Sequence, residues 1–159
     1  MSFLNDGTIG VNLGATPSTT SEFTLGASHT GTDGTKWLYV KSAGAISQYD
    51  YVTVDEDMVA TQGAKAGVDD GHIVAFAQVA FSAADEYGWV ALAGTGISTN
   101  VLGSCAADVA LYTSGTAGAL DDSSTSQTKI DGVVLVTANA SSTAQSGEII
   151  ATYPKSTTF

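Results

Sequence analysis

Apolar and polar residues alternate along several short segments, and this period of two is the strongest regular signal in the chain. Such alternation is typical of β-strands whose two faces meet different surroundings. It predicts strands at residues 36–42, 49–55, 58–61, 73–80, 86–92, 108–113, 133–137 and 148–153. Turn signals such as Asp33-Gly34, Asp69-Asp70-Gly71 and Asp131-Gly132 separate several of these segments.

Helical periodicity is weak, because glycine or a β-branched residue interrupts almost every window. We expect at most a short helical turn, near residues 82–86 or 104–109. Many short strands joined by frequent turns predict an all-β fold, either a single compact β-sandwich or a small β-barrel.

Residues 1–35 differ from the rest, since they are rich in Gly, Ser and Thr and carry only isolated apolar residues. Such a stretch has too little apolar surface to fold alone. We therefore predict an extended N-terminal arm with the first turn at 1–35, followed by a β domain at 36–159. Ile9, Val11 and Leu13 repeat with a period of two, which suits strand addition to a partner. The alternative is that this segment forms the first strand of the domain's own sheet.

Three pairs of segments suggest an internal duplication. Residues 50–54 resemble 108–112, residues 73–76 resemble 133–136, and residues 88–91 resemble 147–150, at separations of 58 to 60 residues. Two explanations remain open at this point. The β domain could consist of two similar β units, at about 45–102 and 103–154, or strands rich in Ala and Val could resemble one another by chance.

The charge balance narrows the choice of partners. Sixteen Asp and Glu stand against five Lys and no Arg, which gives a net charge of −11. Nucleic-acid binding depends on Lys and Arg, and anionic membrane surfaces repel an acidic chain. We therefore expect neither nucleic acid nor membrane as a partner. The N-terminal residues also lack the basic and apolar regions of a signal peptide, so none is expected.

Residues with catalytic potential are few. His29 and His72 are expected in solvent-facing loops, and Cys105 is expected to be a small buried hydrophobic residue. Asp55-Glu56-Asp57 has oxygen ligands that calcium could use, but its spacing does not follow a calcium loop, which favours a solvated acidic turn. The sequence predicts no catalytic residue, no metal site and no cofactor.

Aromatic residues in the second predicted strand point to a contact surface. Tyr49 and Tyr51 share one strand face, and the residues between and beyond them share the other. Both faces cannot point into one core, so one of them should be exposed or buried against a partner. Tyr and Trp are enriched in such contacts. The predicted partner-contact residues, from the arm and from this strand, are Phe3, Leu4, Ile9, Val11, Leu13, Tyr49 and Tyr51.

A series of turn and strand segments follows in order between residues 23 and 153. It includes Gly31-Thr32-Asp33-Gly34-Thr35-Lys36-Trp37, Tyr49-Asp50-Tyr51-Val52-Thr53-Val54-Asp55-Glu56, Glu86-Tyr87-Gly88-Trp89-Val90, Ala107-Asp108-Val109-Ala110-Leu111-Tyr112-Thr113, Thr116-Ala117-Gly118-Ala119-Leu120-Asp121-Asp122 and Asp131-Gly132-Val133-Val134-Leu135. This series resembles the capsid decoration (cement) proteins of tailed bacteriophages. Residues 1–22 have no counterpart in the resemblance.

The resemblance implies a structural virion protein and not an enzyme. Such a protein is made in the host cytoplasm, binds the outer surface of the capsid and stabilises contacts between major capsid proteins. Its implied partners are the major capsid protein and neighbouring copies of itself, with a homotrimer favoured. The alternative is a carbohydrate-binding β module of a phage fibre or bacterial surface protein. That alternative predicts an exposed, coplanar pair of Trp37 and Trp89, on which a sugar could stack.

Overall fold

The structure, a computed structural model, describes residues 11–64, 72–125 and 127–157. These residues form ten strands and no helix, so the predicted all-β fold is confirmed and neither expected helical turn is present. The strands are β1 (Ser28–Thr30), β2 (Lys36–Ser42), β3 (Tyr51–Val54), β4 (Val59–Gln62), β5 (Ile73–Phe76), β6 (Tyr87–Val101), β7 (Val109–Thr113), β8 (Ala119–Asp121), β9 (Lys129–Leu135) and β10 (Gln145–Thr157).

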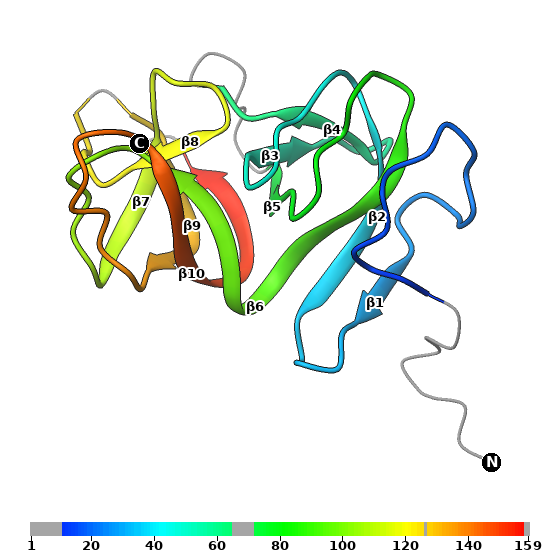
Figure 1. Ribbon diagram of the computed structural model, residues 1–159, viewed down its shortest axis with the longest axis horizontal. Helices are drawn as coiled ribbons and strands as arrows, with labels where there is room; N and C mark the ends of the chain where they lie inside the picture. The colour runs from blue at the N-terminus through cyan, green and yellow to red at the C-terminus, as the bar shows by residue number, and fades with distance from the viewer. Residues whose placement is uncertain (1–10, 65–71, 126, 158–159) are drawn as a thin grey trace.

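The strands close into two small barrels that lie side by side and share β6 (Figure 1). In the first barrel, β6 pairs with both β2 and β5, and β3 and β4 complete the ring. In the second barrel, the later part of β6 pairs with β8 and β10, and β7 and β9 complete the ring. Closure matters because it leaves few unpaired strand edges.

The two barrels use the same strand pairings in the same order. The first strand of each runs parallel to the third, as β2 does to β4 and β6 does to β8, and every other pair in the ring is antiparallel. The register repeats as well, since Leu38 lies opposite Val90 in the first barrel and Ile97 lies opposite Ile149 in the second. Each residue of the second pair lies 59 positions after its counterpart in the first.

The shared strand β6 is much longer than the strand that the sequence predicts at residues 86–92, because it continues through two glycines. Gly94 and Gly96 have φ values of 144° and 74°, which are conformations that favour glycine. A Cβ atom on Gly94 would also lie 2.9 Å from the hydroxyl oxygen of Thr35. These glycines therefore allow one strand to bend and to serve both barrels.

Two apolar clusters occupy the barrels and the space between them. The interior of the first barrel contains Leu38, Val40, Val52, Val54, Ala60, Ala75 and Val90. Strand alternation turns their neighbours outward, and four of these, Tyr51, Val74, Phe76 and Ala91, join the core of the second barrel. All four are fully buried, so the junction between the barrels is a continuous part of the hydrophobic core.

A buried carboxylate also connects the barrels. Asp50 is 3 % exposed and accepts hydrogen bonds from the backbone N–H of Ser47 (2.9 Å), Gln62 Nε2 (2.6 Å) and Asn100 Nδ2 (3.0 Å). Asn100 lies on the part of β6 that belongs to the second barrel. Gly118, at φ 74°, passes so close that a Cβ atom there would lie 2.2 Å from the Asp50 carboxyl group, so this position requires glycine.

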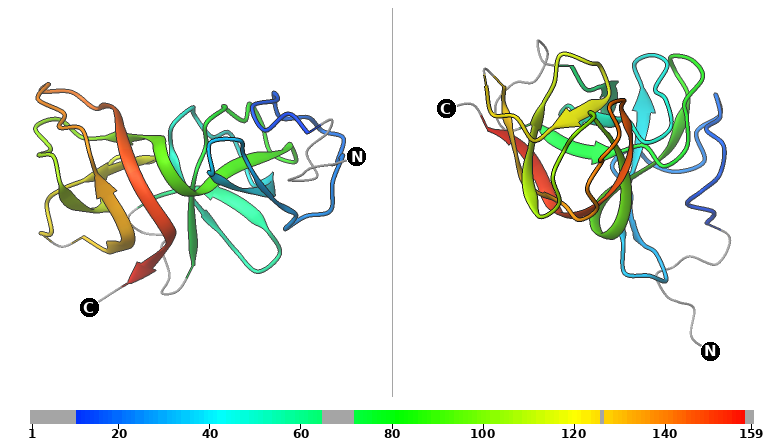
Figure 2. Two further views of the ribbon diagram at one scale, coloured as in Figure 1. Left: turned by 90° about the horizontal axis from the view of Figure 1, so that it is seen from below. Right: turned by 60° about the vertical axis from the view of Figure 1, so that its left-hand side comes forward.

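The N-terminal segment lies along the outside of the first barrel (Figure 2). Ser18 and Tyr87 exchange two backbone hydrogen bonds, of 3.0 and 2.7 Å, and β1 pairs with β2. From residue 11 onward, the segment predicted as an arm thus contacts the chain's own first barrel. Phe3, Leu4 and Ile9 lie outside the described residues.

Candidate functional site

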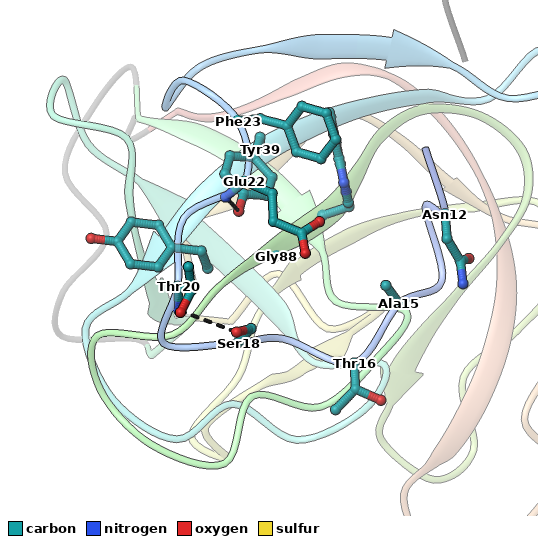
Figure 3. Close-up of a pocket in the computed structure, with 11 residues that line it drawn as sticks. Asn12, Ala15, Thr16, Ser18, Thr20, Glu22, Phe23, Tyr39 and Gly88 are labelled. Atoms are coloured by element: carbon teal, nitrogen blue, oxygen red, sulfur yellow. Dashed lines mark hydrogen bonds between the residues drawn. The ribbon is translucent and has the colours of Figure 1, made fainter. Parts of the chain in front are cut away.

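An aromatic cluster holds the N-terminal segment on the first barrel (Figure 3). Tyr39 and Trp89 lie directly opposite each other on β2 and β6, with ring centroids 5.0 Å apart. The Phe23 ring meets both edge-to-face at 5.3 Å, and His29 meets Trp89 at 5.2 Å. The backbone N–H of Glu22 donates to the Tyr39 hydroxyl at 3.1 Å. Each aromatic pair contributes about 0.5–1.5 kcal/mol beyond its area burial, so the segment is firmly attached here.

Beside this cluster lies a cavity of about 90 Å³. It is lined by Asn12, Ala15, Thr16, Ser18, Thr20, Glu22, Phe23, Tyr39, Tyr87, Gly88 and Trp89. Pockets for small organic ligands typically measure roughly 300–1,000 Å³. The cavity therefore suits a few water molecules rather than a ligand.

The tryptophans do not form the platform that the carbohydrate-binding alternative requires. Trp89 is only 4 % exposed, because Phe23 and Tyr39 cover it. Trp37 is half-buried and packs against the core of the second barrel. Two tryptophans in these positions do not present an exposed, coplanar surface for a sugar ring.

Two of the predicted contact residues line a broad hollow on the first barrel. Val11 and Leu13 are half-buried and face this hollow together with Trp37 and the turn that follows β1. Its volume is about 460 Å³. The described residues begin with Val11, so the hollow lies at the start of the described chain.

Tyr49 and Tyr51 have different surroundings. Tyr51 is fully buried at the junction of the barrels, and its hydroxyl has no hydrogen-bond partner among the described residues. Burial raises the pKa of this hydroxyl well above its ordinary value. Tyr49 is half-buried, with φ at 69°, and its carbonyl oxygen accepts a hydrogen bond from the Asn100 N–H at 2.7 Å. The partner that covers Tyr51 is thus the chain's own second barrel.

Sequence reasoning did not single out the outer surface of β9 and β10. Val134, Ile150 and Tyr153 are 40 %, 42 % and 62 % exposed, although all three are large and apolar or aromatic. The signal was present as two runs of consecutive apolar β-branched residues, Val133-Val134 and Ile149-Ile150. Because side chains alternate between faces, one residue of each run must point out of the barrel.

A groove adjoins Tyr153 at the place where β5, β6 and β10 approach one another. Its volume is about 240 Å³, and Ile73, Leu92, Tyr153, Pro154 and Lys155 line it. Tyr153 adopts φ 50°, an uncommon backbone conformation for an aromatic residue. We call these five residues the β10 groove.

The acidic turns have local structural roles. The Asp55 carboxylate accepts hydrogen bonds from the backbone N–H groups of Asp57 (3.0 Å) and Val59 (2.9 Å), which fixes the turn before β4. In the second barrel, the Asp122 carboxylate accepts a bond from the Ala106 N–H at 2.9 Å. Carboxylates in such positions stabilise turns.

Cys105 lies beside Asp121 and Asp122, and the possible ligand atoms of all three residues lie within 4.8 Å of one another. The cysteine is 2 % exposed, and burial raises the pKa of its thiol to about 11. The thiol is therefore protonated at neutral pH. Nucleophiles and metal ligands use the thiolate form, so the described geometry does not activate this group.

The histidines differ from the expectation that both lie in solvent-facing loops. His29 is in β1 and is half-buried against Phe23 and Trp89, because the N-terminal segment folds back over β2 and β6. His72 is half-buried immediately before β5, and its carbonyl oxygen accepts a hydrogen bond from the Ser156 N–H at 3.3 Å.

Comparison with protein-family models and with curated proteins gives no match for this sequence. Within the described residues there is no helix that could span a bilayer.

Proposed function

We propose that this protein is a structural component of a phage virion. It binds the outer surface of the capsid and stabilises contacts between major capsid proteins. The observation that carries the proposal is the ordered series of segments between residues 23 and 153, which resembles capsid decoration proteins of tailed bacteriophages.

The architecture is compatible with this role. Two closed barrels joined through a common core form a stiff body with few free strand edges, which limits association of the protein with itself through its sheets. A net charge of −11 further favours solubility of the free protein before assembly. Attachment would then depend on apolar contacts and backbone hydrogen bonds rather than on ion pairs.

The N-terminal segment supplies the proposed capsid contact. Val11 and Leu13 line the hollow beside Trp37 and are spaced two residues apart, as on one face of an extended strand. An extended segment with these residues could add a strand to an edge of the major capsid protein. Localisation at the capsid surface and the major capsid protein as partner are parts of the same proposal.

The test combines sedimentation with thermal unfolding. Capsids of the cognate phage, stripped of decoration proteins, are mixed with the purified protein, sedimented and heated beside untreated capsids. We expect the protein to sediment with capsids and to raise their melting temperature, because a ligand of the assembled state stabilises that state. Leu13→Asp should weaken sedimentation, whereas Thr16→Asp, which adds the same charge at an exposed position, should not. Failure of the wild-type protein to sediment, together with identical melting of both capsid samples, would contradict the proposal.

A further inference from the structure

Equivalent outer faces of the two barrels are covered differently. In the first barrel, Phe76 on β5 and Ala91 on β6 lie opposite each other, point outward and are fully buried against the second barrel. The equivalent pair in the second barrel is Val134 on β9 and Ile150 on β10, 58 and 59 residues later, and both are exposed. The outer face of a terminal repeat is normally polar, so an apolar face here indicates a contact with another protein.

The β10 groove continues the apolar surface along the same strand, and Lys155 adds a positive charge to it.

The other lysines of the described residues have partners within the chain. Lys41 forms an ion pair with Asp85, and Lys129 forms one with Asp131. Lys36 donates a hydrogen bond to Thr30. Lys155 is the only lysine of the described residues whose side chain makes no such bond. An unpaired cation next to Leu92 and Tyr153 suits an apolar segment that also carries an acidic residue.

The N-terminal ten residues of the chain have this composition. Phe3, Leu4 and Ile9 are apolar, and Asp6 is the only charged side chain among them. This segment joins the described chain at residue 11, next to the first barrel, whereas β9 and β10 lie at the other end of the molecule (Figures 1 and 2). Ten extended residues span at most about 33–36 Å. A neighbouring molecule can bring its first residues to this groove without crossing its own body.

We propose that the β10 groove of one copy binds residues 1–10 of a second copy. The apolar side chains of the segment cover Leu92 and Tyr153, and Asp6 pairs with Lys155. The inference goes beyond the proposed function, because it assigns a self-association surface and the segment that fills it, and it stands or falls independently of capsid binding.

Reversal of the two charges provides the test. The molecular mass of the full-length protein is measured by light scattering over a range of concentrations. Asp6→Lys and Lys155→Glu should each weaken self-association about tenfold, because an attractive pair at the rim of the contact becomes repulsive. An equimolar mixture of the two variants should associate as well as the wild type, because each segment then meets a groove of opposite charge. Lys41→Glu, with the same change in charge on the first barrel, serves as the control and should associate normally.

Several results would overturn the inference. A wild-type protein that stays monomeric at every concentration would do so, as would self-association that neither charge reversal weakens. If each variant is impaired but the mixture is not restored, Asp6 and Lys155 do not pair between copies and the proposed exchange is wrong. Capsid binding by a monomeric wild type would leave the proposed function intact, while normal self-association without capsid binding would contradict only the proposed function.

Discussion

The two barrels share their strand pairings but differ in what they present inside and outside. Inside the first barrel, Ala60 occupies the position that Leu120 occupies in the second, since they pair with the equivalent residues Ser42 and Val101. Phe81, from the connection between β5 and β6, adds volume to the first interior. The two barrels therefore fill their interiors with different side chains, which is consistent with the tolerance of cores for volume-conserving changes.

The outer faces show the larger difference. The first barrel is covered twice, by the second barrel over Val74 and Phe76 and by the N-terminal segment over Tyr39 and Trp89. The second barrel leaves Val134 and Ile150 exposed. Topology thus sets the path of the chain, whereas the outward residues decide whether a face becomes part of the core or a candidate contact surface.

The largest effect is expected where the barrels meet. Phe76→Ala removes a fully buried ring from the junction and should lower the free energy of unfolding by about 3–5 kcal/mol. Urea unfolding followed by circular dichroism measures this change. Because the ring belongs to the core cluster of the second barrel, we expect one transition that shifts as a whole. Two separate transitions, of which only one shifts, would show that the barrels unfold independently and would break the comparison.

A somewhat smaller effect is expected from Asp50. Asp50→Ala leaves Gln62, Asn100 and the Ser47 N–H without their acceptor, and we expect a loss of about 3 kcal/mol. Asp85→Asn is the control, because Asp85 pairs with Lys41 while 75 % of its side chain is exposed and asparagine tolerates the φ of 64° at this position, and it should cost less than about 1 kcal/mol. Equal losses in both variants, measured by urea unfolding, would contradict a special role for the junction.

Most of the strands could be predicted from the sequence, because alternation and turn residues are local signals. The predicted strand at 73–80 was too long, since β5 ends at Phe76, and the predicted end at residue 92 missed the later part of β6. Glycine usually weakens a strand, and nothing local indicates that Gly94 and Gly96 bend this one instead of ending it. β8 has only three residues, and its partner β6 is distant in the sequence. The local pattern of these residues therefore indicates a turn and not a strand.

The contact surfaces were harder to predict, because alternation shows that a face needs cover but not what covers it. For Tyr51 the cover is the second barrel of the same chain. For Ile150 no described residue provides comparable cover. Both residues are apolar and lie on strands, and only the three-dimensional arrangement separates them.

The third prediction concerns the entrance to β6 and its dependence on pH. The Glu86 carboxylate accepts hydrogen bonds from the Ser82 hydroxyl and from the backbone N–H groups of Ser82 and Ala83, at 2.6, 2.6 and 3.3 Å. Hydrogen bonding by Ser82 lowers the pKa of Glu86 below its ordinary value of 4.5. The folded state therefore binds this proton less readily than the unfolded state, so the stabilisation is complete above that value and is lost as the pH falls through the lowered pKa.

Glu86→Gln should consequently destabilise the protein at neutral pH and lose its effect in acid. Urea unfolding of the variant and the wild type is compared at pH 7 and at a series of values below the ordinary pKa. Glu148→Gln is the control, since Glu148 occupies an exposed position on β10, and its effect should be small at every pH. A difference between Glu86→Gln and the wild type that does not change with pH would contradict the proposed role of the carboxylate.

The smallest expected effect on stability is that of a substitution on the outer face of the second barrel, which is compared with the same substitution on the outer face of the first. Val74 on β5 and Val134 on β9 both point out of their barrels, but the first is fully buried and the second is 40 % exposed. Replacement of valine by threonine keeps the side-chain shape and exchanges a methyl group for a hydroxyl. Val134→Thr should change the free energy of unfolding of the monomer by no more than about 0.5 kcal/mol, because water can solvate the hydroxyl. Val74→Thr buries the same hydroxyl in the junction and should cost about 1–3 kcal/mol. Urea unfolding of both variants at low protein concentration measures the difference, and equal values would mean that the two faces are covered to the same extent.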